Sequence, residues 1–479
     1  MHADSNAIQS NVPVDVQSEP APPSQVAPLY PAPPTAGQSE LTYGLEDRPP
    51  LAETLWVALQ HVFAAFVGII TPPLVIATAL GLDPASTSYL VSMSLFASGL
   101  CTFIQCRQVG PIGSGLLSLQ GTSFAFLGPI IGVSTTAMQS GQSPQEALAL
   151  VFGVCCFGSL TVMVLSSFLP VLQRVITPVV SGTVVLLIGL SLIKVGVVNL
   201  AGGMAAQHDG TFGSYSHLAL GGGVLAVILL LNATGNRYLR MGAIVIGLLV
   251  GYGVAILLGK VDFSFLQQLP LVNLPLPLRY GMRFDFSAVV PFVLLYVIVT
   301  IESIGDLTAT SVVSNQPISG AVYWRRIRGG ILGDGINSLL AAILNTFPNT
   351  TFCQNNGVIQ MTGVGSRYVG FYVAAILALL GLLPSVGGVV QAIPAPVLGG
   401  ATLIMFGSIA VTGIHIVASA PLDRRALSIV ALSLALGLGV AYAPEILEGK
   451  PALIQQVFSS SVSTGGLTAM VLNLLLPRS

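Results

Sequence analysis

Long apolar stretches separated by glycines, prolines and charged residues dominate the chain. Leu218–Leu231, Met241–Leu258 and Phe286–Thr300 come close to the roughly 20 residues that a helix needs to cross a bilayer. These runs are continuous, which excludes a transmembrane barrel, because barrel strands alternate apolar and polar residues. The pattern predicts an all-α polytopic membrane protein with fourteen segments near residues 51–79, 87–106, 112–133, 145–169, 177–200, 217–233, 238–259, 286–312, 328–346, 352–362, 366–384, 394–418, 424–442 and 453–476.

Composition supports the membrane setting. The chain is 53% hydrophobic and 7% charged, whereas soluble proteins carry about 25% charged residues. A formal net charge of −1 argues against a nucleic-acid partner. The five cysteines have no metal-ligand spacing, so no metal site is expected. Residues 1–50 hold ten of the 31 prolines and no apolar run, which predicts a disordered Pro-rich cytoplasmic tail over residues 1–48.

Basic residues indicate the orientation. With the N-terminus inside, twelve arginines fall on the inner side and four basic residues on the outer side. This asymmetry is the one expected of a multi-pass protein of a cell (inner or plasma) membrane with both termini in the cytoplasm.

An internal repeat relates the two halves of the chain. Residues 178–189 of the fifth segment align without gaps on residues 396–407 of the twelfth, and Gly121–Phe124 of the third aligns with Asn349–Phe352 of the tenth. Each pair lies seven segments apart. Because seven is odd, the second copy is inverted, which predicts two inverted repeats of seven.

The third and tenth segments are both interrupted by polar residues, Gly or Pro. Short, broken segments at corresponding positions of two repeats point to a substrate site near the bilayer midplane. The Thr-Ser-Phe and Thr-Thr-Phe pieces favour extended backbone, which survives at membrane depth only where it pairs or lines a cavity. We expect two short crossed or paired β-strands, each followed by a half-helix whose N-terminal N–H groups face a shared pocket.

Acidic residues lie in the eighth and ninth segments. Glu302 and Asp306 are four residues apart and share one helical face, and Asp334 follows in the ninth segment. Acids within membrane helices normally face an interior cavity, although capping or packing between helices is the alternative for each of them, and Asp334 also suits a position near the interface. His61 in the first segment fits a structural role and a proton carrier equally well.

Four motifs resemble those of a known family. They are Gln354–Gly363, Glu302–Ser311, Gln120–Phe124 and Asn345–Asn349. Together they resemble the signatures of the nucleobase–ascorbate transporter family, also called nucleobase:cation symporters, and within it those of bacterial xanthine permeases. The resemblance covers about residues 40–477.

The resemblance implies the roles of individual residues. Glu302 matches the glutamate that accepts hydrogen bonds from the ring N–H groups of the base. Gln354 matches a position where glutamine is typical of purine carriers and glutamate of uracil carriers, and an amide offers both a donor and an acceptor. The implied substrate-binding residues are Glu302, Gln354, Phe124, Ser123 and Asn355. The residues implied in proton coupling or site organisation are Asp306, Asp334, His61 and Thr362.

The family fold is also implied. It comprises a core of segments 1–4 and 8–11, a gate of segments 5–7 and 12–14, and usually a homodimer. The expected divisions are 49–200 (segments 1–4 of the core and segment 5 of the gate), 201–285 (segments 6–7 of the gate and the outer loop), 286–384 (segments 8–11 of the core) and 385–479 (segments 12–14 of the gate).

These observations predict a secondary active transporter that imports purine nucleobases, xanthine or urate, by proton symport and alternating access. A carboxyl group in a low-dielectric site favours its protonated form, so a proton suffices as coupling ion and no cofactor is expected. A channel or anion exchanger of the same fold would need a basic residue at the half-helices, and residues 112–133 and 345–363 contain none. A uracil-type carrier is a further alternative. An enzyme is disfavoured, since no metal cluster or nucleophile–base constellation is recognisable. The sequence leaves open the choice between xanthine and urate and between proton and sodium.

Overall fold

The computed structural model describes most of the chain from residue 41 onward. The described residues are 41–169, 177–236, 242–264, 274–318, 320–352, 354–418, 420–450 and 460–477, with Leu239, Val272, Ile454 and Phe458. The predicted tail over residues 1–48 lies outside them except for its last eight residues. Those eight residues, 41–48, pack against the turn that follows residue 362 and are part of the described fold.

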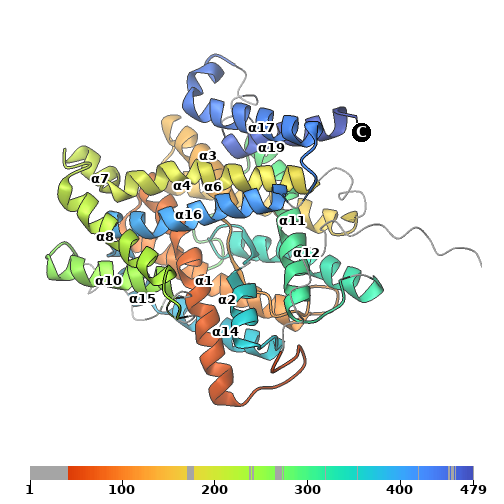
Figure 1. Ribbon diagram of the computed structural model, residues 1–479. Helices are drawn as coiled ribbons and strands as arrows, with labels where there is room; N and C mark the ends of the chain where they lie inside the picture. Colours follow the sequence, from red (N-terminus) through yellow and green to blue (C-terminus); the bar gives the residue numbers. More distant parts are fainter. Residues whose placement is uncertain are drawn as a thin grey trace, which may run out of the picture.

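The described residues form a mostly helical molecule (Figure 1), and two short strands within it pair into a small sheet. The elements of the first half are α1 (Leu51–Leu80), α2 (Pro84–Arg107), β1 (Gln120–Thr122), η1 (Phe124–Phe126), α3 (Leu127–Gln139), α4 (Pro144–Leu165), α6 (Pro178–Leu200), α7 (Gly203–His208), α8 (Tyr215–Asn232) and α10 (Ala243–Leu257). Those of the second half are α11 (Phe286–Val313), α12 (Gly320–Ile343), β2 (Asn349–Thr351), α13 (Gln354–Thr362), α14 (Arg367–Leu382), α15 (Pro384–Gln391), α16 (Ala395–Ala418), α17 (Arg424–Tyr442), η3 (Pro444–Leu447) and α19 (Ser461–Leu475).

Local sequence explains where several of these helices begin. The Ser143 side chain accepts a hydrogen bond from the Glu146 backbone N–H, and the Glu146 carboxylate accepts one from the Ser143 N–H, which forms a capping box at the start of α4. Asp83 caps α2 in a similar way and is followed by Pro84 at the first helical position. Asp423 caps α17.

Many of the described helices have the length and the apolar composition of membrane-spanning helices. Among the described residues, eight are long and apolar enough to cross one, or nine if α14 and α15, which meet at a bend of 81°, form one span. The eight are α1, α2, α4, α6, α8, α11, α16 and α17. The protein is therefore a multi-pass membrane protein. Shorter apolar helices (α10, α19 and the one that contains α3) accompany them.

The helix contacts repeat between the two halves. In chain order, α1, α2, β1–α3, α4, α6, α8 and α10 correspond to α11, α12, β2–α13, α14, α16, α17 and α19. The contact of α2 with α14 recurs as α12 with α4, that of α8 with α10 as α17 with α19, and that of α8 with α16 as α17 with α6. The predicted internal repeat is therefore present in the packing of the described helices.

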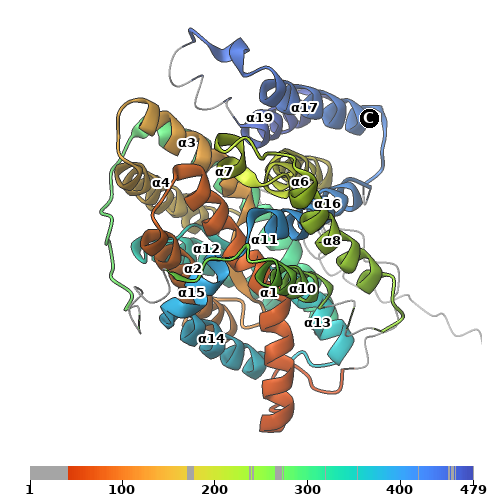
Figure 2. The same cartoon turned by 90° about the vertical axis from the view of Figure 1, so that its left-hand side faces the viewer.

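The helices α6 and α16 run side by side (Figure 1). A side-chain carbon at Gly182 would lie 2.6 Å from the backbone nitrogen of Val417, and one at Gly196 would lie 2.8 Å from the Leu403 side chain. These neighbours run in opposite directions along the two helices, so α6 and α16 are antiparallel. Small residues allow membrane helices to approach this closely. Figure 2 shows α17 and α19 at one end of the molecule and α14 at the other.

The predicted pair of short strands is confirmed. β1 and β2 pair antiparallel, with Gly121 opposite Thr350 and Thr122 opposite Asn349. In the sequence alignment, Gly121 corresponds to Asn349 and Thr122 to Thr350. Each of these two pairs is therefore the symmetry mate of the other, and the strand register follows the symmetry of the repeat. The pairing extends to Ser123, whose N–H donates to the Pro348 carbonyl at 2.8 Å.

Candidate functional site

The acids of α11 lie at the paired strands. The Thr351 hydroxyl of β2 donates to Oδ2 of Asp306 at 3.2 Å, and the Ser303 and Thr350 hydroxyls lie 3.2 Å apart. Glu302 and Asp306 are both half-buried. Two side-chain hydrogen bonds therefore fix α11 against β2 and hold one carboxyl group at the strand that leads into α13.

The helix α13 is anchored by two of its three leading polar residues. Asn355 is 2% exposed, and its Nδ2 donates to the Leu117 carbonyl at 2.5 Å. The Oδ1 atom of Asn356 accepts a hydrogen bond from the Thr310 hydroxyl of α11 at 2.8 Å. Gln354, the first residue of α13, has an exposed side chain. The two asparagines hold the helix, and Gln354 is the most exposed of the three leading residues.

Phe124, the first residue of η1, lies against α16. Its half-buried ring packs edge-on against Phe406 of α16, with the ring centroids 5.8 Å apart. Ser123 is buried beside it, at the end of β1. The aligned residue of the other repeat, Phe352, is buried instead, because Gly68 of α1 and Gly121 of β1 leave room for its ring.

Asp334 belongs to a buried polar group behind the strands. It is 4% exposed, and its Oδ1 accepts a hydrogen bond from Gln105 Nε2 at 3.1 Å. The same nitrogen donates to the Gly330 carbonyl at 3.2 Å, while Gln105 Oε1 accepts from the Ser114 backbone N–H at 3.1 Å. Asp334 therefore faces the protein interior, between α12 and α2.

Two further predicted residues, His61 and Thr362, form no hydrogen bond to the strands or to the acids of α11 among the described residues. His61 is fully buried in α1, and neither ring nitrogen has a hydrogen-bond partner within the described part of the chain. The Thr362 hydroxyl donates to the Val358 carbonyl at 2.9 Å and accepts from the Val364 N–H at 3.2 Å. Thr362 therefore organises the end of α13.

Sequence reasoning missed the residues that connect the elements. They are Thr351, Thr350, Thr310, Asn356 and Gln105. Their polarity within apolar segments was a signal, and Asn356 belongs to the signature run. Their partners depend on how α2, α11 and the strands pack, which the spacing along the chain does not show. No cluster of three or more His, Cys, Asp or Glu that could hold a metal occurs among the described residues.

Comparison with known proteins defines the class. Residues 52–446 match a family model described as a permease family. With its multiple apolar helices, the protein is a membrane permease and not an enzyme. The chain belongs to this permease family, the nucleobase–ascorbate transporter family.

Several curated relatives align over nearly the whole chain. The chain is 52% identical to the xanthine permease XanP of Escherichia coli, over 92% of this chain and 95% of that protein. It is 47% identical to the xanthine permease XanQ of the same organism, over 92% and 94%. A putative purine permease of Clostridium perfringens is 39% identical, also over 92% and 94%.

Solved structures share the fold at low sequence identity. The transmembrane domain of the cyanobacterial bicarbonate transporter BicA matches with a TM-score of 0.56 at 12% identity, covering 90% of this chain and 99% of that one. The murine anion transporter Slc26a9 matches with a TM-score of 0.53 at 12% identity, covering 90% and 69%.

Proposed function

We propose that the protein imports purine nucleobases, with xanthine as principal substrate and urate as a second one, by proton symport. The observation that carries this proposal is the placement of Glu302 and Asp306 on α11, with Asp306 bonded to β2 directly before the exposed Gln354. A carboxylate accepts hydrogen bonds from ring N–H groups, and an amide both donates and accepts. A purine dione offers both kinds of group.

Three considerations support a purine substrate, of which the first and the third count against uracil. Gln354 is an amide where the resemblance gives uracil carriers a carboxylate. Phe124 supplies an accessible aromatic ring on the opposite strand unit, against which a flat base stacks. Relatives that are 52% and 47% identical are named xanthine permeases, and a third is named a putative purine permease.

Transport would follow alternating access between two bodies. Seven elements in each half supply fourteen segments, of which segments 1–4 and 8–11 form the core and segments 5–7 and 12–14 form the gate. In this proposed division the Phe124–Phe406 contact would join core and gate, so it would break or slide when they shift. A homodimer in the inner or plasma membrane, with both termini in the cytoplasm, completes the proposal.

Protonation supplies the coupling. A charged carboxylate is costly to carry across a low-dielectric region, and a proton on Glu302 or Asp306 removes that cost. Asp334 and His61 are the further candidates for organising or relaying the proton. Substrate binding to the protonated site would then permit the loaded core to move.

The experiment is uptake of labelled xanthine by cells that express the protein, with a panel of unlabelled purines and pyrimidines as competitors and with and without a protonophore. Competition by xanthine or urate, together with loss of accumulation on adding the protonophore, supports the proposal. Competition by uracil alone would refute the substrate assignment.

A further inference from the structure

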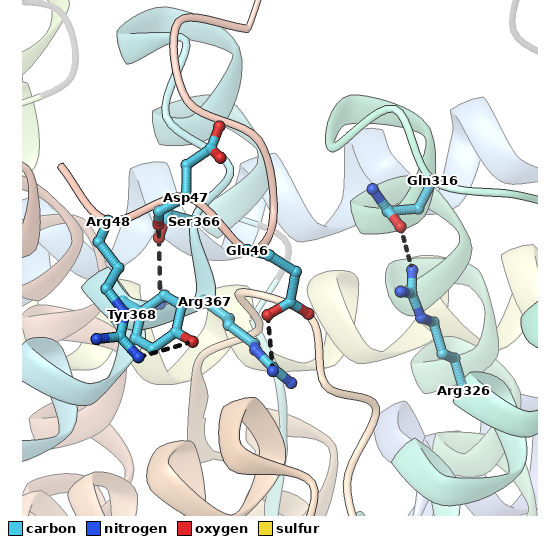
Figure 3. A network of polar contacts seen from close by, with 8 residues as sticks. All are labelled: Glu46, Asp47, Arg48, Gln316, Arg326, Ser366, Arg367 and Tyr368. Atoms are coloured by element: carbon cyan, nitrogen blue, oxygen red, sulfur yellow. Dashed lines mark hydrogen bonds and ion pairs between the residues drawn. The ribbon is translucent and has the colours of Figure 1, made fainter.

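Residues 41–48, which we call the N-terminal strap, lie across the turn that joins α13 to α14 (Figure 3). The strap precedes α1 in sequence, yet it is bonded to a segment more than 300 residues further along the chain. The turn that it covers, residues 363–367, directly follows the helix that carries Gln354. A segment outside the predicted membrane spans therefore touches the end of the site helix.

Backbone hydrogen bonds form most of this attachment. The Gly363 carbonyl accepts from the N–H groups of Thr42, at 2.8 Å, and Tyr43, at 3.2 Å. The Gly365 N–H donates to the Tyr43 carbonyl at 2.9 Å, and Tyr43 and Val364 form a parallel β-bridge. Carbonyls at a helix C-terminus lack partners within the helix. The strap thus provides hydrogen-bond partners for the backbone groups just beyond α13.

Side chains reinforce the attachment. Glu46 and Arg367 form an ion pair at 2.7 Å, and the Arg367 N–H donates to the Leu45 carbonyl at 3.1 Å. The Arg48 guanidinium lies 4.5 Å from the centre of the Tyr368 ring (Figure 3). Leu45 is only 5% exposed. Exposed ion pairs contribute little to stability. The backbone hydrogen bonds and the buried Leu45 therefore account for most of the attachment of the strap.

Apolar side chains of the strap pack on the larger hydrophobic cluster to which both site helices contribute. Leu41 and Tyr43 pack on a buried cluster that contains Val313 of α11 and Ile359 of α13. At its nine residues α13 is shorter than any helix that is stable by itself in water, and it lies between a strand and a turn. Its orientation therefore depends on what holds its two ends. Asn355 holds the first end and the strap holds the second.

We propose that the N-terminal strap is a positioning element of the substrate site. By fixing the C-terminal end of α13, it sets the affinity for the purine. It remains attached to α13 and α14 throughout the transport cycle and does not open as a lid. The positioning residues are Leu45 and the strap backbone at Thr42 and Tyr43. This inference rests on the proposed function only where affinity for a purine is measured.

The first test replaces residues 41–46 with a Gly-Ser sequence of equal length. We expect the KM for xanthine to rise roughly tenfold, because a small misplacement of a binding group is costly, while Vmax per protein in the membrane changes less than about twofold. Leu45→Ala is a milder variant, for which a smaller rise in KM is expected. The matched control deletes residues 2–36, which leaves the strap intact and should keep the wild-type KM. An unchanged KM in the strap replacement would overturn the inference.

The second test distinguishes an attached strap from a lid. Tyr43→Cys and Val364→Cys place two thiols at partners of the β-bridge, close enough for a disulfide. Oxidation of this pair should leave uptake within about twofold of the reduced protein, with Tyr43→Cys alone as control. Loss of uptake on oxidation, restored by a reductant, would show that the strap must open.

The third test requires no substrate. Amide hydrogen exchange of residues 354–362 should be faster in the strap replacement than in the wild type, because local opening becomes easier. Absence of xanthine uptake by the wild-type protein refutes the proposed function, while this exchange still tests the strap. Unchanged exchange of α13, or faster exchange with an unchanged KM, refutes the strap as a positioning element.

Discussion

The two units of the repeat, each a short strand followed by a short helix, have a similar backbone arrangement but differ in the chemistry of their side chains. β1 leads through η1 into α3, which begins Leu127-Gly128-Pro129, whereas β2 leads into α13, which begins Gln354-Asn355-Asn356. The aligned phenylalanines also differ, since Phe124 is half-buried at α16 and Phe352 is buried under α1 and β1. The repeat thus supplies a symmetric frame, and its side chains assign polar recognition to the second unit.

The corresponding helices α11 and α1 both contact the second unit, but with different chemistry. α11 offers Asp306 to the Thr351 hydroxyl of β2, whereas its counterpart α1 offers Gly68 to the ring of Phe352. One contact is polar and leaves a carboxyl group at the site. The other is apolar packing that fixes the sheet. The comparison teaches that the second unit combines polar recognition with a buried anchor, Phe352, whereas the first unit offers an accessible ring, Phe124, a division that substitutions at aligned positions can break.

The aligned phenylalanines provide the largest expected contrast. Phe352→Ala removes a buried ring packed on two glycines, and we expect it to destabilise the protein by about 3–5 kcal/mol. Phe124→Ala removes a half-buried ring, so a smaller loss of stability is expected together with a higher KM for xanthine. Thermal unfolding of the purified protein in detergent, compared with uptake kinetics, measures both. Equal losses of stability in the two variants would contradict the assignment.

The acids of α11 test the polar half directly. Glu302→Gln keeps the shape and removes the charge, and loss of a hydrogen bond to a charged group costs about 1.5–3 kcal/mol. We expect xanthine uptake efficiency to fall by roughly 10 to 150-fold. Glu445→Gln, at an exposed glutamate in the first turn of η3, is the matched control. Asp306→Asn tests the second acid, and undiminished pH-driven accumulation by both Glu302→Gln and Asp306→Asn would eliminate the coupling scheme.

The exposed glutamine sharpens the substrate assignment. Gln354→Glu replaces a donor with a group that only accepts when ionised, so affinity for xanthine should fall by roughly tenfold and inhibition by uracil should increase. Gln360→Glu changes a second exposed glutamine of the same helix and should have little effect. Inhibition constants for xanthine and uracil measure the shift. Similar changes in the two variants would indicate a general effect of charge on α13.

The aligned threonines of the strands give the smallest contrast. Thr350→Val removes the hydroxyl that lies 3.2 Å from Ser303, which should cost about 1 kcal/mol and lower uptake a few-fold. Thr122→Val replaces a buried hydroxyl that has no hydrogen-bond partner among the described residues, so it should be neutral. Uptake and thermal stability of the two valine variants decide the point. A larger effect at Thr122 would reverse the proposed division.

Much of the frame could be predicted from the sequence. Alignment of Gly121–Phe124 with Asn349–Phe352 predicted paired strands in the right segments, because a repeat constrains both copies together, although the observed strands begin two residues and one residue earlier than the predicted extended pieces. The acids of α11 were recognisable since charge within an apolar helix is rare. The strap was not predicted, because residues 1–50 read by composition alone resemble one disordered tail. The side to which Asn355 turns was not predictable either, since it depends on the carbonyl of Leu117 in the other repeat.

The central claim is proton-coupled purine transport at the site between α11 and α13. The most direct measurement is uptake of labelled xanthine by proteoliposomes that contain the purified protein, with a pH gradient imposed across the membrane. The account predicts transient accumulation when the compartment from which xanthine enters is the more acidic, abolished by a protonophore and strongly reduced in Glu302→Gln. Accumulation that ignores the pH gradient, or that Glu302→Gln leaves intact, would contradict it.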